Sequence, residues 1–147
     1  MARIPDDVTV LRVVKYPSRM YPENAAGPMR DAFFPNSGDY RDAAERGIPV
    51  QVSVFDQTLT TPEQAIAIRN LGKPMPLVYQ VLGLLVQHAR AVNPDRIDVV
   101  RDPLPPSFGP GADGHGGILG LEQKAGERAD VYKFLCQKLA DLCFSIK

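Results

Sequence analysis

Residues 103–120, PLPPSFGPGADGHGGILG, constrain the fold most, because their four prolines and six glycines exclude a continuous helix. Few core-forming side chains surround the single imidazole in this stretch, that of His115, so it has no evident structural role. Proline stiffens the first half, and glycine in the second half permits positive φ and close backbone approach to another molecule. The stretch therefore predicts a surface loop used for binding or catalysis.

Apolar periodicity on either side of this loop predicts an α/β (or α+β) fold. One domain spanning residues 1–147 is expected, with about four strands and three to four helices packed on the sheet. Residues 15–39 form a long irregular connection pinned by Phe33 and Phe34. Strands are predicted at 8–14, 50–55, 77–81 and 97–101, and helices at 40–46, 62–70, 83–92 and 130–146.

Three of these elements carry further expectations. Alternation in 50–55 places Gln51 and Ser53 on the solvent face of a half-exposed strand. Residues 77–92 also fit one helix weakened by Gly83, but we favour a strand followed by a helix. In the last helix, Cys136 and Cys143 are seven positions apart, about 10 Å, which is beyond disulfide reach and predicts reduced core thiols.

The charge balance argues against a nucleic-acid binder. Seventeen basic and seventeen acidic residues cancel, and no Lys/Arg run exceeds two. Nucleic-acid-binding proteins usually carry a basic face or stripe instead. The N-terminus lacks the pattern of a signal peptide or membrane anchor, so a soluble, cytoplasmic protein without a membrane partner is expected.

The chemistry expected in the glycine-rich stretch centres on His115. Its imidazole titrates near neutrality and suits a general acid or base, with Asp113 as an orienting carboxylate. Nearby glycine N–H groups can hold an anion, and arginines on other elements can clamp it. The ligand-binding candidates are Gly114, Gly116, Gly117, Arg12 and Arg30.

Other motifs in the chain predict neither a cofactor nor a metal. Residues 109–114 match G-x-G-x-x-G but lack the strand and helix that a dinucleotide site needs. The two histidines and two cysteines lack zinc-ligand spacing. Arg12, Ser53 and Glu122 are interpreted as a strand arginine, a solvent-face serine and a helix-start glutamate. Four carboxylates near predicted strand ends are interpreted as caps and solvated turns, namely Asp56, Glu63, Asp98 and Asp102.

Two functions remain open. The first is an interaction or regulatory domain whose 103–120 loop binds a protein partner, with Leu104 and Phe108 as anchors, or a second copy of the chain. The second is a small enzyme acting on a nucleotide, a phosphorylated or an acyl substrate, with His115 as general acid or base. Missing catalytic signatures favour the first, although Leu104 and Phe108 fit a loop packed on the core equally well.

Overall fold

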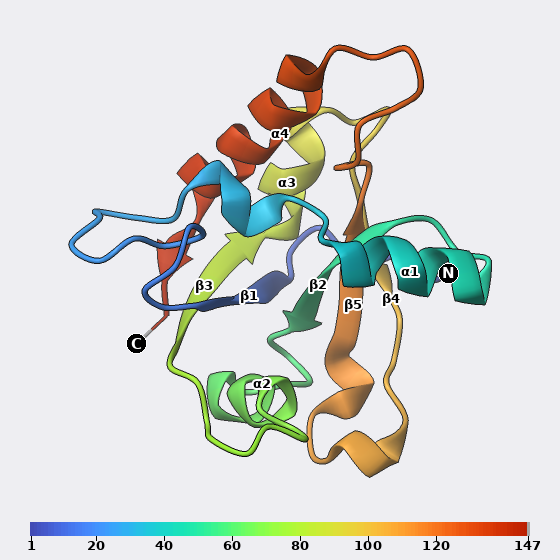
Figure 1. Cartoon of the computed structure of the whole chain (residues 1–147). Coiled ribbons are helices and arrows are strands. Elements are labelled where there is room, and N and C mark those ends of the chain that lie inside the picture. The colour runs from blue at the N-terminus through green and yellow to red at the C-terminus, as the bar shows by residue number, and fades with distance from the viewer. Residues whose placement is uncertain (147) are drawn as a thin grey trace.

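A computed structural model describes residues 1–146 and shows one mixed sheet-and-helix assembly (Figure 1). Six strands form a single sheet in the order β4-β5-β2-β1-β3-β6, and every neighbouring pair is antiparallel. The strands are β1 (Thr9–Lys15), β2 (Gln51–Asp56), β3 (Tyr79–Leu85), β4 (Asp98–Arg101), β5 (His115–Leu119) and β6 (Phe144–Ser145).

Helices cover both faces of the sheet. The α-helices are α1 (Ser37–Arg46), α2 (Pro62–Arg69), α3 (Val86–Val92) and α4 (Ala129–Leu142), and short 3-10 helices are η1 (Arg30–Phe33), η2 (Pro106–Phe108) and η3 (Ala112–Gly114). Figure 1 shows α3 and α4 side by side, with α2 at the opposite end of the view. The antiparallel pairing makes this an α+β fold, and the expected strand number is corrected from about four to six.

The two apolar clusters follow from the alternation of side chains along each strand. On β1, Val10 and Val14 join a larger cluster with α3, α4 and the buried Phe33 of η1. Leu11 and Val13 point the other way and join a smaller cluster with α2. The 15–39 connection is therefore pinned by Phe33, with Phe34 packed beside it, as predicted.

The start of α2 at Pro62 is confirmed, whereas that of α1 is not. Thr61 caps α2, and its side chain and that of Gln64 form a reciprocal capping box. The helix α1 ends at Gly47 with φ 64°, as predicted, but it begins at Ser37 rather than residue 40 because Asn36 and Asp39 form a second capping box. Capping chemistry thus extends α1 by three residues upstream of its apolar pattern.

Packing shifts the boundary between the third strand and its helix. The strand β3 continues through Gly83 to Leu85, where the sequence predicts a helix from residue 83. A Cβ at Gly83 would collide with the ring of Phe144, so glycine lets β6 lie close against β3. Because β6 pairs with β3, α4 ends at Leu142, and residues 143–146 do not continue the helix that was predicted to reach residue 146.

The strand β2 is not half-exposed. Gln51 is only 6% exposed, and the strand is buried along nearly its whole length because both faces of the sheet are covered there. Cys136 and Cys143 are both free, as predicted, and burial raises the pKa of each thiol to about 12.

Candidate functional site

The segment predicted as a loop divides at His115. Residues 103–114 are irregular apart from η2 and η3, but His115–Leu119 form β5, which lies between β4 and β2 in the sheet. His115 is 8% exposed and begins this strand. The prediction of a surface loop over residues 103–120 is therefore wrong for its second half.

Both ring nitrogens of His115 have partners. Nδ1 lies 2.8 Å from the backbone oxygen of Asp102, and Nε2 lies 3.1 Å from Oγ of Ser53. A backbone carbonyl only accepts hydrogen bonds, so Nδ1 carries the proton in the neutral ring. Nε2 is then left as the acceptor of the Ser53 hydroxyl proton. The ring of Phe55 packs edge-on against the imidazole, 5.3 Å between centroids.

The surroundings of His115 favour its neutral form. Burial lowers the pKa of His115 below its ordinary value, although contact with the Asp102 carbonyl acts in the opposite direction. A neutral imidazole with a free lone pair on Nε2 is the form that can accept a proton. The pair of Ser53 and His115 therefore has the arrangement of a hydroxyl held against a base.

Asp102 fixes the segment that orients this histidine. The residue is buried, with 6% of its surface exposed. Its carboxylate accepts hydrogen bonds from both terminal nitrogens of Arg46, at 2.7 and 2.6 Å, and from Nε2 of Gln51, at 2.6 Å. The Arg46 hydrogen bonds are the main reason why the pKa of Asp102 is lowered. Asp102 is thus a buried, paired carboxylate, and the interpretation as a solvated turn is wrong. The interpretation as a cap or solvated turn is also wrong for Asp56, which is fully buried and forms an ion pair with Arg101.

Ser53 and His115 line a pocket of about 200 Å³ between β2, α2 and the 103–114 segment. Its walls combine these two polar groups with apolar side chains and one cation. The lining residues are Ser53, Phe55, Ile68, Arg69, Leu104, Phe108 and His115. Arg69 is not among the residues predicted from the sequence, and Ser53 was expected on the solvent face. The parity that Ser53 shares with Phe55 on β2 is a signal for Ser53, whereas no sequence signal points to Arg69.

The predicted partners of His115 within its own segment are not the ones found. Asp113 is exposed on η3, and both imidazole nitrogens are engaged elsewhere, so an orienting role for Asp113 is wrong. The N–H of Gly114 donates to the Gly111 carbonyl. Gly116 and Gly117 lie inside the sheet, paired to β2 on one side and β4 on the other. The expected anion nest of glycine N–H groups is therefore replaced by a strand.

The two predicted clamp arginines lie apart. Arg12 on β1 is 4% exposed, and its NH1 donates to the Ser53 carbonyl at 3.1 Å, beside the pocket. Arg30 is exposed at the start of η1, on the side of the sheet that packs against α4. Of the two, only Arg12 contacts a residue of the His115 site, and it does so through the backbone of Ser53. Glu122 also lies away from it, with its carbonyl oxygen bound by Arg96.

The two predicted partner anchors differ in burial. Leu104 is partly buried against the smaller apolar cluster, and its N–H donates to the Ala112 carbonyl at 3.0 Å. Phe108 is 39% exposed at the rim of the pocket. Leu104 therefore packs its segment onto the core, whereas Phe108 faces outward enough to meet another molecule.

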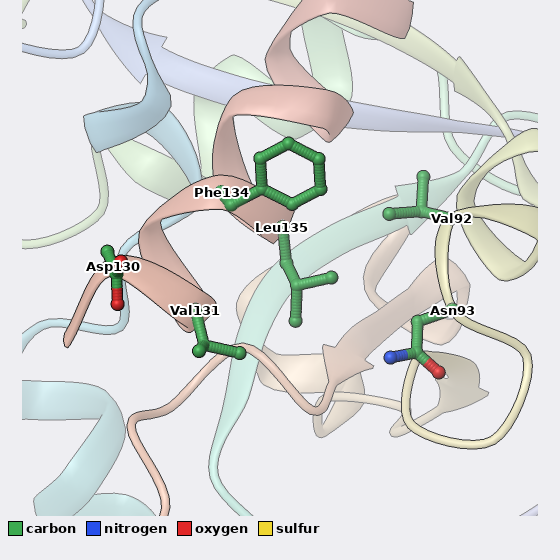
Figure 2. A pocket seen from close by; sticks show the side chains of 6 residues that line it. All are labelled: Val92, Asn93, Asp130, Val131, Phe134 and Leu135. Carbon is green, nitrogen blue, oxygen red and sulfur yellow. The ribbon is translucent and has the colours of Figure 1, made fainter. Parts of the chain in front are cut away.

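A second hollow of about 550 Å³ lies between the end of α3 and the start of α4 (Figure 2). Val92, Val131 and Phe134 line most of it, and its one carboxylate, Asp130, is paired with the exposed Arg128 at 2.6 Å. Apart from this paired carboxylate, the hollow is lined by no group that suits nucleophilic or acid-base chemistry. The smaller His115 pocket is therefore the better candidate site.

Residues 1–146 contain no cluster of three or more histidine, cysteine, aspartate or glutamate side chains placed to hold a metal ion. Within the same residues, no helix combines the length and apolar content needed to cross a bilayer. A scan against protein-family models gives no match to this chain, and searches of curated proteins and of solved structures give none either.

Proposed function

We propose that the protein is a small enzyme that transfers an acyl group through Ser53, with His115 as general base and then general acid. The observation that carries this proposal is the 3.1 Å contact between Ser53 Oγ and His115 Nε2, with the imidazole oriented through Nδ1 by the Asp102 carbonyl. A nucleophile in contact with a base that a third group orients is the arrangement of a covalent hydrolase or transferase.

The proposed reaction has two balanced steps. As Ser53 Oγ attacks the carbonyl carbon of an ester, its proton moves to His115 Nε2, and the proton then passes to the departing alcohol as the carbon–oxygen bond breaks. Water or another alcohol attacks the acyl-enzyme in the second step and gives its proton to Nε2. Ser53 Oγ regains a proton from the imidazole when the acyl group leaves.

The pocket wall limits which acyl groups fit. Phe55, Ile68 and Leu104 offer apolar surface on the side facing Ser53 and His115. A volume of about 200 Å³ is at the small end for ligand sites, which favours a short acyl chain over a large substrate. Phe108, at the rim, is placed to cover a bound acyl group.

Covalent labelling with a fluorophosphonate probe tests the proposal without a known substrate. Ser53 Oγ should displace fluoride, form an oxygen–phosphorus bond and pass its proton to His115. Intact-mass spectrometry should then show one adduct, mapped to Ser53 after digestion. In His115→Gln, the labelling rate should fall about 10²–10⁴-fold, the usual contribution of a general base.

Ser53→Ala and Ser107→Ala are the matched controls, since Ser107 is exposed on the nearby η2 helix and lies outside the pocket lining. The first variant should not label and the second should label like the parent. Labelling that persists in Ser53→Ala, or that is equally fast in His115→Gln, would exclude the acyl-transfer function.

We propose, as a second candidate, that residues 103–114 bind a protein partner. The observation that favours it is an apolar groove of about 380 Å³ beside Phe108, bordered by Leu71, which is 51% exposed. If Phe108 anchors a partner, Phe108→Ala should weaken its capture about 10-fold or more, with Ser107→Ala as control. Equal capture by the two variants would argue against this function.

A further inference from the structure

The strands β1 and β2 separate beside the candidate site. Their pairing is limited to Val10 with Asp56 and Leu11 with Phe55, whereas β1 pairs with β3 along all seven of its residues. The divergence of β1 from β2 is visible in Figure 1. Beyond these pairs, the Arg12 guanidinium donates to the Ser53 carbonyl at 3.1 Å, where hydrogen bonds between the two strands would otherwise continue.

Arg12 is buried with neutral partners. Its Nε donates to the Ala32 carbonyl at 2.8 Å, and its other acceptor is also a backbone oxygen. Other arginines with little exposed side chain have carboxylates at hand: Arg90 binds Asp98, and Arg96 binds Glu127. Among residues 1–146, Arg12 forms no such ion pair. A buried cation without a paired anion is unfavourable, so an anion bound nearby would stabilise it.

A second cation belongs to the pocket itself. Arg69, at the end of α2, lines the Ser53–His115 pocket, and its Nε is buried without a hydrogen-bond partner in the described chain. Its guanidinium carbon lies 5.9 Å from the centroid of the Tyr79 ring, which positions the side chain without neutralising it. Arg69 also has no ion pair within residues 1–146.

The two arginines influence each other. Burial, and after it the charge of Arg69, lowers the pKa of Arg12 to about 10. The carboxylate whose charge acts on both is that of Asp39, which accepts from the backbone N–H of Asn36 at 2.8 Å in the α1 capping box. Among the residues that line the pocket, Arg69 is the one that carries a full charge, which an anionic group bound there would neutralise.

We infer that Arg69, supported by the charge of Arg12, binds an oxyanion group of the substrate, a carboxylate or a phosphate, next to the Ser53 hydroxyl. This inference rests on the proposed acyl-transfer function and narrows its substrate class to small acyl esters that carry such a group. The guanidinium of Arg69 offers the two-pronged donor set that carboxylates and phosphates accept. The apolar wall then receives the acyl chain.

Anion binding to Ser53→Ala protein tests this inference, because that variant cannot form an acyl-enzyme. Inorganic phosphate and succinate are titrated separately at an ionic strength held constant with sodium chloride, and the melting temperature and backbone amide shifts are followed. At least one anion should raise the melting temperature and shift amides around Arg69. The anion that binds more tightly identifies the group, phosphate or carboxylate.

Matched variants on the Ser53→Ala background make the test specific. Arg69→Gln should weaken binding about 10-fold or more, and Arg69→Lys, which keeps the charge but not the planar donor pair, should weaken it less. Arg128→Gln, which removes an exposed arginine at the start of α4 and outside the pocket lining, should leave anion binding within about twofold of the parent.

Equal binding by the parent and Arg69→Gln, or no response beyond that to sodium chloride, would overturn this inference. The result is separable from that of the labelling experiment. Anion binding through Arg69 without fluorophosphonate labelling would leave the anion site standing and exclude acyl transfer. Labelling of Ser53 without anion binding would support acyl transfer and exclude the anion site at Arg69.

Discussion

The backbone oxygen of Asp102 accepts a 2.8 Å hydrogen bond from Nδ1 of His115, while the carboxylate of the same aspartate is bound by Arg46 and Gln51. Asp102 thus fixes the imidazole through its main chain and fixes its own main chain through its side chain. The geometry of the candidate site consequently depends on a carboxylate that never touches the imidazole.

Asp102→Asn should destabilise the fold. The substitution removes the charge that both partners recognise and leaves Gln51, which is 6% exposed, with a weaker acceptor for its Nε2. We expect the free energy of unfolding, measured by urea denaturation, to fall by about 1–3 kcal/mol. Asp42→Asn is the control, since Asp42 forms an exposed pair with the same Arg46 and should change stability by less than about 1 kcal/mol. Equal effects of the two substitutions would contradict the buried role of Asp102.

The stability of the protein should decrease as the solution becomes mildly acidic. Because burial lowers the pKa of His115, the unfolded chain binds a proton at a higher pH than the folded one. Stability therefore falls as pH decreases through the ordinary histidine pKa, roughly 6.5, toward the lower value of the folded state. Asp102 adds a second loss at lower pH, because its carboxylate pKa is also lowered in the folded state.

Urea denaturation at closely spaced pH values between about 7.5 and 5 checks the histidine part of this prediction, since it lies above the range of an ordinary carboxyl. The slope there should approach, and not exceed, about 1.4 kcal/mol per pH unit for one proton. His115→Gln should flatten it. A slope that is the same in His115→Gln and the parent would assign the effect to other groups.

Gly116→Ala should destabilise the sheet although alanine is small. A Cβ at this position would collide with the backbone oxygen of Val100 on β4, and a backbone atom cannot move aside as a side chain can. We expect a loss of about 1–3 kcal/mol in thermal or urea unfolding. Gly27→Ala is the matched control, because a Cβ there meets nothing within 4 Å, and it should change stability by less than about 0.5 kcal/mol.

These glycines also explain why β5 could not be predicted. The sequence HGGIL lacks the β-branched and alternating pattern that identified β1, β2 and β4, so it was assigned to a loop. The reason for glycine lies in the neighbouring strands, where Gly117 leaves room for the Gln51 side chain and Gly116 for the Val100 backbone. Such close approach between residues more than ten positions apart is invisible in a linear pattern.

The site shows the same division between local and non-local information. The sequence indicates His115 because an imidazole stands out among glycines, and it offers Arg12, on the first predicted strand, as a candidate anion clamp. The other polar groups of the pocket come from elsewhere in the chain: Ser53, which contacts His115, is on β2, and Arg69 is on α2. Alternation placed Ser53 on the correct side of its strand but could not indicate that α2 and the 103–114 segment cover that side.

Thr60→Val should loosen the 103–114 segment over the pocket. Thr60 is 1% exposed, and its Oγ1 donates to the Gly111 carbonyl at 2.7 Å, which ties the start of α2 to the turn preceding His115. Valine keeps the shape but loses the donor, so we expect a loss of about 1 kcal/mol and faster hydrogen exchange at the Ala112 and Gly114 amides. Ser107→Ala, on the exposed surface of the same segment, should change neither quantity.

The same variant should also affect the candidate site. Because the 103–114 segment supplies Leu104 and Phe108 to the lining of the Ser53–His115 pocket, fluorophosphonate labelling of Thr60→Val should slow while the protein remains folded. Unaltered exchange at both amides would show that the segment is held by Leu104 and its apolar neighbours instead.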